Sequence, residues 1–136
     1  GTGALGLEAL SRGAARAVFI DANPKAVELV KKNMAACGMQ DSAAVFCWDI
    51  LKNINCIAGL GARFDLVFMD PPYNRGALAP SLLNLLKVGA LTDDALVIIE
   101  HAPAEPPPEG TGGLSAIDTR RYGKTIVTFM SRMLRG

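Results

Sequence analysis

The sequence predicts an α/β fold, in which helices and strands alternate to build a mostly parallel sheet that an antiparallel hairpin closes. Three observations lead to this prediction. Half of the 136 residues are apolar and 20% are charged, a composition that can bury a core. Apolar runs of strand length alternate with segments of helical period, the order typical of β-α-β units. Near the C-terminus, two strand-like runs flank Gly123-Lys124, which indicates a hairpin turn.

Each element has a local signal. Asn23-Pro24 supplies an N-cap and a first helical residue, and Gly38 ends the helix that follows. The segment 102–113 holds four prolines and three glycines, so we expect a loop there. The predicted helices are 4–12 (capped by Gly13), 24–37, 51–57 (a weaker one) and 78–88, and the predicted strands are 17–21, 44–48, 64–69, 95–99, 115–122 and 125–133.

Charge and cysteine content exclude several classes of protein. Basic and acidic residues nearly cancel, 14 against 13, so no polyelectrolyte tail by itself indicates nucleic acid. No apolar run approaches the roughly 20 residues of a membrane span, and no signal peptide is visible. Three cysteines without C-x-x-C spacing indicate reduced thiols in a cytoplasmic protein rather than a metal site.

The C-terminal end departs from this balance. From Ser115 onward, five basic residues stand against one acid, Asp118. A basic end can contact an anionic partner. The charges can equally serve to protect an edge strand from pairing with other chains. The sequence alone leaves both interpretations open.

The first residues carry a glycine-rich turn. Gly1, Gly3 and Gly6 fit the pattern G-x-G-x-x-G, which lets backbone N–H groups approach a ligand closely. Such a turn normally follows a strand. The chain begins on the turn, so we interpret it as a fragment that lacks the first strand of its sheet. Asp21 ends the next strand 18 residues after Gly3, near the offset of an acid that holds a ribose diol. The alternatives are a loop cap for the glycines and a helix cap for Asp21.

Asp70-Pro71-Pro72-Tyr73 is the most specific signal. It follows the strand 64–69, at the carboxyl edge where open α/β sheets bind ligands. Proline has no N–H, so the Asp70 carboxylate and the Pro71 carbonyl form a rigid pair of hydrogen-bond acceptors. Such a pair suits an exocyclic amino group on a planar ring, on which Tyr73 can stack. The alternative is a structural Pro-Pro turn with a core tyrosine.

Three segments together resemble the class I S-adenosylmethionine-dependent methyltransferases: residues 1–14, 19–23 and 70–73. With the closing hairpin at 121–125, the chain is similar to the RsmD family of 16S rRNA (guanine-N2)-methyltransferases. The resemblance covers nearly all of the chain and implies a doubly wound, Rossmann-like methyltransferase sheet, in a single domain over 1–136. It also implies S-adenosyl-L-methionine as cofactor, 16S rRNA or the small ribosomal subunit as partner, a monomer, no metal and no membrane.

The resemblance also assigns residues to the cofactor. In this assignment the glycine turn wraps the methionine part, Asp21 holds the ribose hydroxyls, and Asp49 accepts from the adenine amino group. The full set is Gly1, Thr2, Gly3, Gly6, Asp21, Ala22, Trp48, Asp49, Ile50 and Asp70.

The implied catalytic residues are Asp70, Pro71, Pro72 and Tyr73. Asp70 and Pro71 would accept hydrogen bonds from the guanine N2 amine, favouring the charge that develops on nitrogen, while Tyr73 stacks on the base. The guanine must be flipped out or single-stranded to reach such a pocket. His101, just past a strand end, is expected to be a bystander.

Three alternatives remain open. A DNA adenine-N6 methyltransferase also uses Asp-Pro-Pro-Tyr. A nicotinamide dehydrogenase shares the glycine pattern but has no need of Asp70-Pro71-Pro72-Tyr73. The third alternative is a non-catalytic nucleotide-binding fragment, because the first strand is missing. That strand would lie at the centre of the sheet, between the strands that end at Asp21 and Met69. Unpaired backbone groups there are costly, so we expect this chain alone not to fold to the active form.

Overall fold

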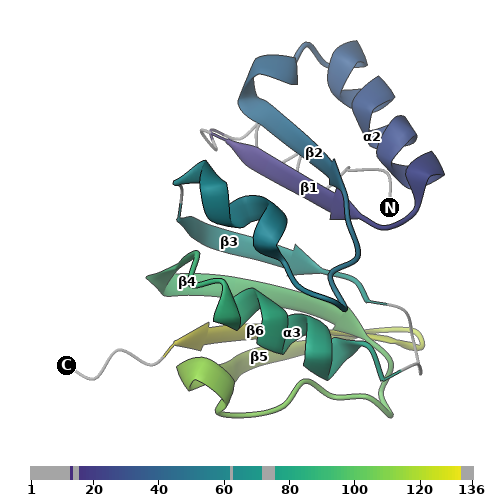
Figure 1. Cartoon of the computed structure of the whole chain (residues 1–136). Coiled ribbons are helices and arrows are strands. Elements are labelled where there is room, and N and C mark those ends of the chain that lie inside the picture. Colours follow the sequence, from purple (N-terminus) through teal and green to yellow (C-terminus); the bar gives the residue numbers. More distant parts are fainter. Residues whose placement is uncertain (1–12, 14–15, 62, 72–75, 133–136) are drawn as a thin grey trace. The chain divides into compact units, whose positions relative to one another are not determined.

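The computed structural model describes residues 13, 16–61, 63–71 and 76–132 of the chain (Figure 1). The chain divides into two compact units, residues 1–50 and 51–136. Each unit has its own sheet and an α-helix in its described part. The single domain over 1–136 stays a prediction.

The first unit is built from two parallel strands and a helix. Ala17 lies opposite Ala43 and Asp21 opposite Cys47, with no break in register. The carboxyl ends of both strands therefore lie at the same edge of this small sheet. The elements in chain order are β1 (Ala17–Asp21), α2 (Pro24–Ala36), the 3-10 helix η1 (Gln40–Ser42) and β2 (Ala43–Cys47).

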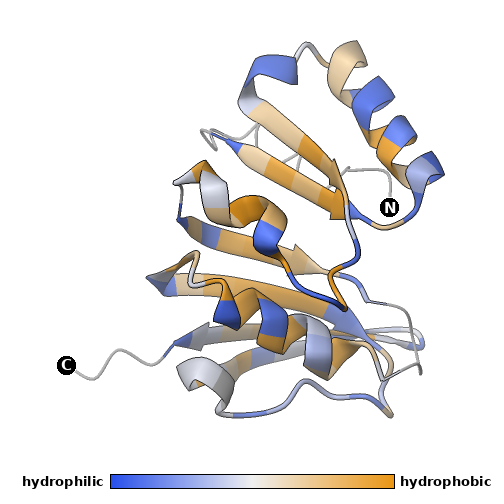
Figure 2. Ribbon diagram, in the orientation of Figure 1, coloured by the Kyte–Doolittle hydropathy of each residue, from blue (hydrophilic) through white to orange (hydrophobic). Residues whose placement is uncertain are grey.

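Helix α2 is stabilised by the N-cap that the sequence predicted and by a buried apolar face. The Asn23 side chain accepts a hydrogen bond of 2.9 Å from the N–H of Lys25, which satisfies one of the first N–H groups of the helix. Val30 and Met34 are buried, and Figure 2 shows hydrophilic residues along the outer turns of α2. The buried face packs against partly buried residues of the strand pair, Phe19, Ala43 and Val45.

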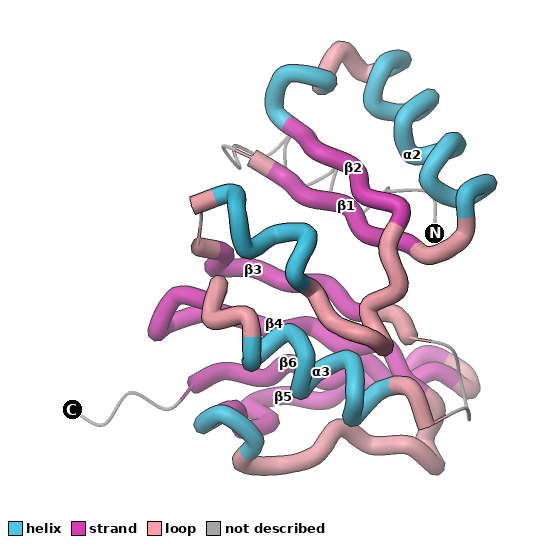
Figure 3. Tube along the Cα trace, in the orientation of Figure 1, coloured by secondary structure: helices cyan, strands magenta, loops and turns pink. Residues whose placement is uncertain are grey.

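The second unit contains a four-stranded mixed sheet in the order β3-β4-β6-β5. β3 and β4 are parallel, and β6 is antiparallel to both of its neighbours. Figure 3 shows these strands with α3 lying over them. The elements in chain order are η2 (Asn55–Leu60), β3 (Phe64–Met69), α3 (Leu78–Lys87), β4 (Leu91–His101), η3 (Thr111–Gly113), β5 (Leu114–Tyr122) and β6 (Thr125–Arg132).

Among the described residues, one face of this sheet is buried and the other is partly exposed. Val97 and Ile99 of β4 are fully buried, as is Met130 of β6, and α3 buries Leu78, Ser81, Leu82 and Leu85. Strand residues alternate between faces, so Leu66 and Phe68 of β3 lie on the opposite face. Their side chains are 39% and 38% exposed.

The predicted fold class is confirmed, with parallel β-α-β units and a C-terminal antiparallel hairpin. The bounds of β1 and β3 are those predicted. β2 begins and ends one residue earlier than predicted, and β4 begins at Leu91 rather than at residue 95. The predicted helix 51–57 is wrong: residues 51–54 form a turn and an irregular segment, and the 3-10 helix η2 begins only at Asn55. Leu51, expected on the apolar side of that helix, is 46% exposed. The predicted helix 4–12 lies outside the described residues.

Within the part of the chain that the structure describes, no helix is long and apolar enough to cross a membrane.

Candidate active site

Asp21 lies at the carboxyl edge of the β1–β2 pair. Its Oδ1 accepts a hydrogen bond of 2.8 Å from the N–H of Asn23, so the carboxylate supports the turn into α2. Among the described residues, Oδ2 has no hydrogen-bond partner, and it can accept from a hydroxyl group of a ligand. The turn-supporting role and the proposed ribose-binding role are therefore compatible in one side chain.

The residues that follow β2 lie beside Asp21. The N–H of Trp48 donates to the Asp21 carbonyl at 3.0 Å. The Cys47 thiol donates to the Ala22 carbonyl at 3.6 Å, joining the same two strand ends. The Trp48 side chain is 37% exposed, and the two residues after it are half-buried. The structure thus brings five predicted cofactor residues to one edge: Asp21, Ala22, Trp48, Asp49 and Ile50.

This edge offers the groups that a nucleoside requires. An exposed indole face can stack on a planar base. Carboxylates accept hydrogen bonds from ribose hydroxyls and from an exocyclic amino group. A nucleoside-containing cofactor therefore fits the donor and acceptor types present. Gly1, Thr2, Gly3 and Gly6, predicted to hold the rest of the cofactor, lie outside the described residues.

In the second unit, Asp70 and Pro71 follow β3 at the carboxyl edge of the four-stranded sheet. Met69 pairs with Ile99, so Asp70 lies level with Glu100 near the end of β4. Asp70 is exposed and Pro71 is buried. Burial and the fixed φ of proline hold the peptide after Asp70 in place. This geometry suits an acceptor pair, while Pro72 and Tyr73 lie outside the described residues.

His101, at the end of β4, is buried between two hydrogen-bond partners. Its Nδ1 lies 2.8 Å from the Ala102 carbonyl oxygen, and its Nε2 lies 2.7 Å from Thr128 Oγ1. A carbonyl only accepts, so Nδ1 carries the proton, and in the neutral ring Nε2 accepts from the Thr128 hydroxyl. Both ring nitrogens are engaged, which supports the interpretation of His101 as a bystander to the chemistry.

The sequence did not point to Glu105. This residue of the loop after β4 accepts a hydrogen bond of 2.9 Å from the N–H of Gly76. It thereby connects that loop to the segment that leads from the Asp70-Pro71 end of β3 into α3. Gly76 and Glu105 are 29 residues apart in the sequence and lie in two irregular loops. Because such loops follow no periodicity, no sequence signal could have located this hydrogen bond.

Two other features carry no role in the site. Among the described residues, no group of three or more histidine, cysteine, aspartate or glutamate side chains could hold a metal ion. An open depression on α2 is lined by Lys25, Glu28, Leu29 and Lys32. None of these is a predicted site residue.

Comparison with known proteins adds independent findings. The family described as "Conserved hypothetical protein 95" matches residues 1–131. The chain is 31% identical over 132 residues to "Putative rRNA methyltransferase YlbH" of Bacillus subtilis, covering 97% of this chain and 72% of that protein. It is 37% identical over 100 residues to "Ribosomal RNA small subunit methyltransferase D" of Escherichia coli K12, covering 74% of this chain and 48% of that protein.

A solved structure, "Putative methyltransferase yhhF from Escherichia coli", shares the fold. It superposes on this chain with a TM-score of 0.82 at 30% sequence identity. The match covers 99% of this chain and 72% of that one. The chain thus spans nearly three quarters of one similar protein and about half of another.

Proposed function

The chain belongs to the RsmD family, and we propose that it carries the catalytic residues of an rRNA methyltransferase that methylates the exocyclic N2 amine of a guanine in 16S rRNA. The observation that carries the proposal is that Asp70, which is exposed, is followed by Pro71, which is buried, at the carboxyl end of β3. The E. coli relative bears the name of a small-subunit rRNA methyltransferase, which favours the small ribosomal subunit or its 16S rRNA as partner.

The methyl donor in this proposal is S-adenosyl-L-methionine, which supplies an electrophilic methyl group on a sulfonium when bound. Asp21 would accept from the ribose hydroxyls through Oδ2, the oxygen that the turn into α2 does not use. Trp48 would line the adenine, and the Asp49 carboxylate would accept from its amino group. The remaining cofactor residues in the proposal are Gly1, Thr2, Gly3, Gly6, Ala22, Ile50 and Asp70.

The base is bound at the end of β3. The Asp70 carboxylate and the Pro71 carbonyl would both accept hydrogen bonds from the guanine N2 amine. The lone pair of that amine is delocalised into the ring, so it is a weak nucleophile. Two fixed acceptors would stabilise the positive charge that develops on nitrogen as the methyl group passes to it from sulfur. The nitrogen would then lose a proton to water. In the proposal, Pro72 would limit the freedom of the segment, and Tyr73 would stack on the base.

The target guanine must leave its helix to reach this edge. A base within a stacked duplex cannot present N2 to a protein pocket, whereas a flipped or unpaired base can. We therefore propose that the enzyme acts, as a monomer in the cytoplasm, on an unpaired or extruded guanine of the small subunit.

Identification of the methylated nucleoside tests the proposal. The full-length protein would be incubated with labelled S-adenosylmethionine and, in parallel, with 16S rRNA, with small subunits from cells that lack the endogenous enzyme, and with duplex DNA. Each nucleic acid would then be digested and its nucleosides separated. We expect N2-methylguanosine from one of the two ribosomal substrates. N6-methyladenine in the DNA, or no transfer to any substrate, would contradict the proposal.

A further inference from the structure

We propose that the tip of the β5–β6 hairpin, residues Arg121 to Lys124, contacts the RNA strand that flanks the target guanine. The inference rests on the proposed function, because it takes the partner to be RNA. It also chooses between the two roles that the sequence leaves open for the basic C-terminal end. The evidence is the charge of the hairpin, its place at the sheet edge, and the contacts of its side chains.

The hairpin is basic within an otherwise acidic unit. From Ser115 onward the sequence has five basic residues and one acid, whereas residues 51–114 have four basic and seven acidic residues. Positive charge in the second unit is therefore concentrated in this segment. Such a distribution is complementary to a polyanion.

The register places the tip at the edge that carries Asp70. β6 is antiparallel to both β4 and β5, so β3, β4 and β5 all run in the same direction. Ile126 of β6 pairs with His101 of β4 on one side and with Arg121 of β5 on the other. In Figure 1 the arrowheads of β3 and β4 point to the side where the β5–β6 turn lies.

The spacing of strands gives the reach. β5 is the third strand from β3, and strands lie about 4.8 Å apart, so the tip is about 14 Å along the edge from Asp70. A few nucleotides of single-stranded RNA span that length. A strand whose guanine is held at Asp70 can therefore place its neighbouring phosphates at the tip.

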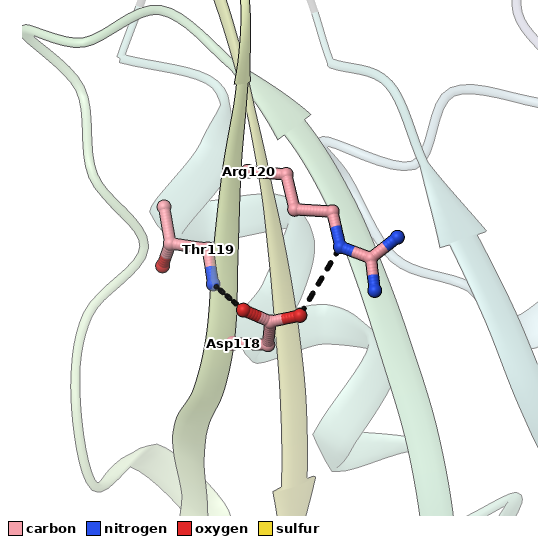
Figure 4. Close-up of polar contacts among 3 residues, drawn as sticks. All are labelled: Asp118, Thr119 and Arg120. Atoms are coloured by element: carbon pink, nitrogen blue, oxygen red, sulfur yellow. Dashed lines mark hydrogen bonds and ion pairs between the residues drawn. The ribbon is translucent and has the colours of Figure 1, made fainter.

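On β5 just before the tip, the charges of Asp118 and Arg120 neutralise one another. Arg120 Nε lies 3.2 Å from Asp118 Oδ2, and the Asp118 carboxylate also accepts from the N–H of Thr119 (Figure 4). The Arg120 guanidinium lies 5.1 Å from the centre of the Phe129 ring. A hydrogen bond with the Tyr122 side chain raises the pKa of Arg120 above its usual value, and the hydrogen bond and negative charge of Asp118 raise it further. These contacts fit the edge-protecting role.

The charges at the tip differ. Arg121 Nε donates to the Gly123 carbonyl at 3.0 Å, across a turn in which Gly123 has φ of +62°. This bond fixes the guanidinium and leaves its terminal nitrogens, among the described residues, without a partner. Within the same residues the Lys124 ammonium has no ion-pair partner. Lys124 also lies in the turn, where it cannot guard a strand edge.

Tyr122 adds a stacking surface. Its side chain is 59% exposed, so its ring is accessible to a base even though its hydroxyl contacts Arg120. Side chains alternate along a strand, so Tyr122 lies on the opposite face of β5 from Arg121, and both lie next to the turn that holds Lys124. Basic side chains together with an exposed aromatic ring are the combination that binds single-stranded nucleic acid without sequence preference.

The test removes the two charges and compares the variant with a matched control. Arg121→Gln/Lys124→Gln changes the tip. Arg63→Gln/Lys87→Gln removes the same charge from exposed residues of the same unit that precede β3 and β4, at the opposite sheet edge. The probe is a short fluorescein-labelled single-stranded oligoribonucleotide, titrated with each full-length protein over a series of salt concentrations.

We expect the tip variant to bind the probe about tenfold or more weakly at low salt. The slope of log K against log salt should fall by about 0.7 for each phosphate that the protein no longer neutralises, hence by about 1.4. The control should keep the wild-type affinity and slope. Tyr122→Leu should weaken binding without changing the slope, and Tyr122→Phe should bind as the wild type does. Equal affinity and slope in the tip variant and the wild type would overturn the proposal.

This outcome is separable from failure of the proposed function. If the wild type methylates no RNA but the tip variant loses salt-dependent binding, the tip contact stands and the proposed reaction falls. If the wild type methylates 16S rRNA and the tip variant has an unchanged KM for that RNA, the reaction stands and the tip contact falls. The KM for S-adenosylmethionine should be the same in both proteins.

Discussion

β3 and β5 are the two outer strands of the same sheet, and they are built in opposite ways. β5 carries three charged residues, Asp118, Arg120 and Arg121, and its side chains from residue 116 onward are exposed. β3 has one charged residue, Asp65, and exposes Leu66 and Phe68. Charges on an outer strand discourage further pairing, and apolar residues do not. β5 is therefore suited to remain an edge, whereas β3 is suited to pair with a further strand.

The two strands also differ in the residues at their carboxyl ends. β3 leads into Asp70 and Pro71, an acceptor pair suited to the reacting amine. β5 leads into a basic tip suited to phosphates. In the proposed mechanism the first acts on the transition state and the second on binding, so their removal should affect different kinetic constants. The predictions below test this difference, beginning with the largest expected effect.

Asp70→Asn should have the largest effect. The substitution keeps the shape of the side chain but replaces one acceptor oxygen with a donor that faces the substrate amine. The rate of methyl transfer should fall by about 10²–10³ or more, as for loss of a preorganised polar group. Affinity for S-adenosylmethionine, measured by calorimetry, should survive. Transfer at close to the wild-type rate would refute the catalytic role of Asp70.

Phe68→Ser tests whether the exposed face of β3 is covered in the protein in solution. If another segment or molecule packs over that face, Phe68 is buried, and the substitution should lower the free energy of unfolding by about 2–4 kcal/mol. Ile117→Ser on β5, where the side chain is 57% exposed, is the control and should change it by about 0.5 kcal/mol or less. Urea unfolding of both variants measures the difference. Equal small changes would mean that this face of β3 is as exposed as that of β5.

Asp21→Ala tests the cofactor edge of the first unit. Charge-assisted hydrogen bonds contribute about 1.5–3 kcal/mol each, so the affinity for S-adenosylmethionine should fall tenfold or more. Asp41→Ala removes an exposed acid just before β2, at the other end of that strand, and should leave the affinity unchanged. Calorimetry that gives the same dissociation constant for the wild type and Asp21→Ala would exclude the ribose contact.

Asp118→Asn should have the smallest effect. The Asp118–Arg120 pair is exposed on both sides, with side chains 49% and 59% accessible. Exposed ion pairs contribute little because water and salt screen them. We expect no measurable change in the urea midpoint and no change in RNA affinity. A large loss of stability would show that the charges of β5 hold the hairpin together.

The sequence predicted the strands best where apolar runs are bounded by punctuating residues. β1 ends in an acid before Asn23-Pro24, and β3 runs into Asp70-Pro71, so both were placed correctly. The start of β4 was missed because Asp93 and Asp94 look like a loop. In the structure the strand begins at Leu91, which pairs with Phe64 across an irregular register.

The candidate site was predictable to the extent that it lies at strand ends. Parallel strands bring their carboxyl ends to one edge, which is why Asp21 and Trp48 could be grouped before the structure was known. The contact between Glu105 and Gly76 could not be predicted, because two irregular loops form it. The place of the hairpin tip at the same sheet edge as Asp70 could not be predicted without the strand order, which charge alone does not give.

The most direct test of the difference between β3 and β5 is a single-turnover measurement of methyl transfer, with RNA and S-adenosylmethionine both saturating. Under these conditions binding defects vanish and only defects in the chemical step remain. Arg121→Gln/Lys124→Gln should then react at the wild-type rate, while Asp70→Asn should be slower by about 10²–10³. An unchanged rate for Asp70→Asn, or an equal loss in both variants, would contradict the assignment of chemistry to the end of β3 and binding to the end of β5.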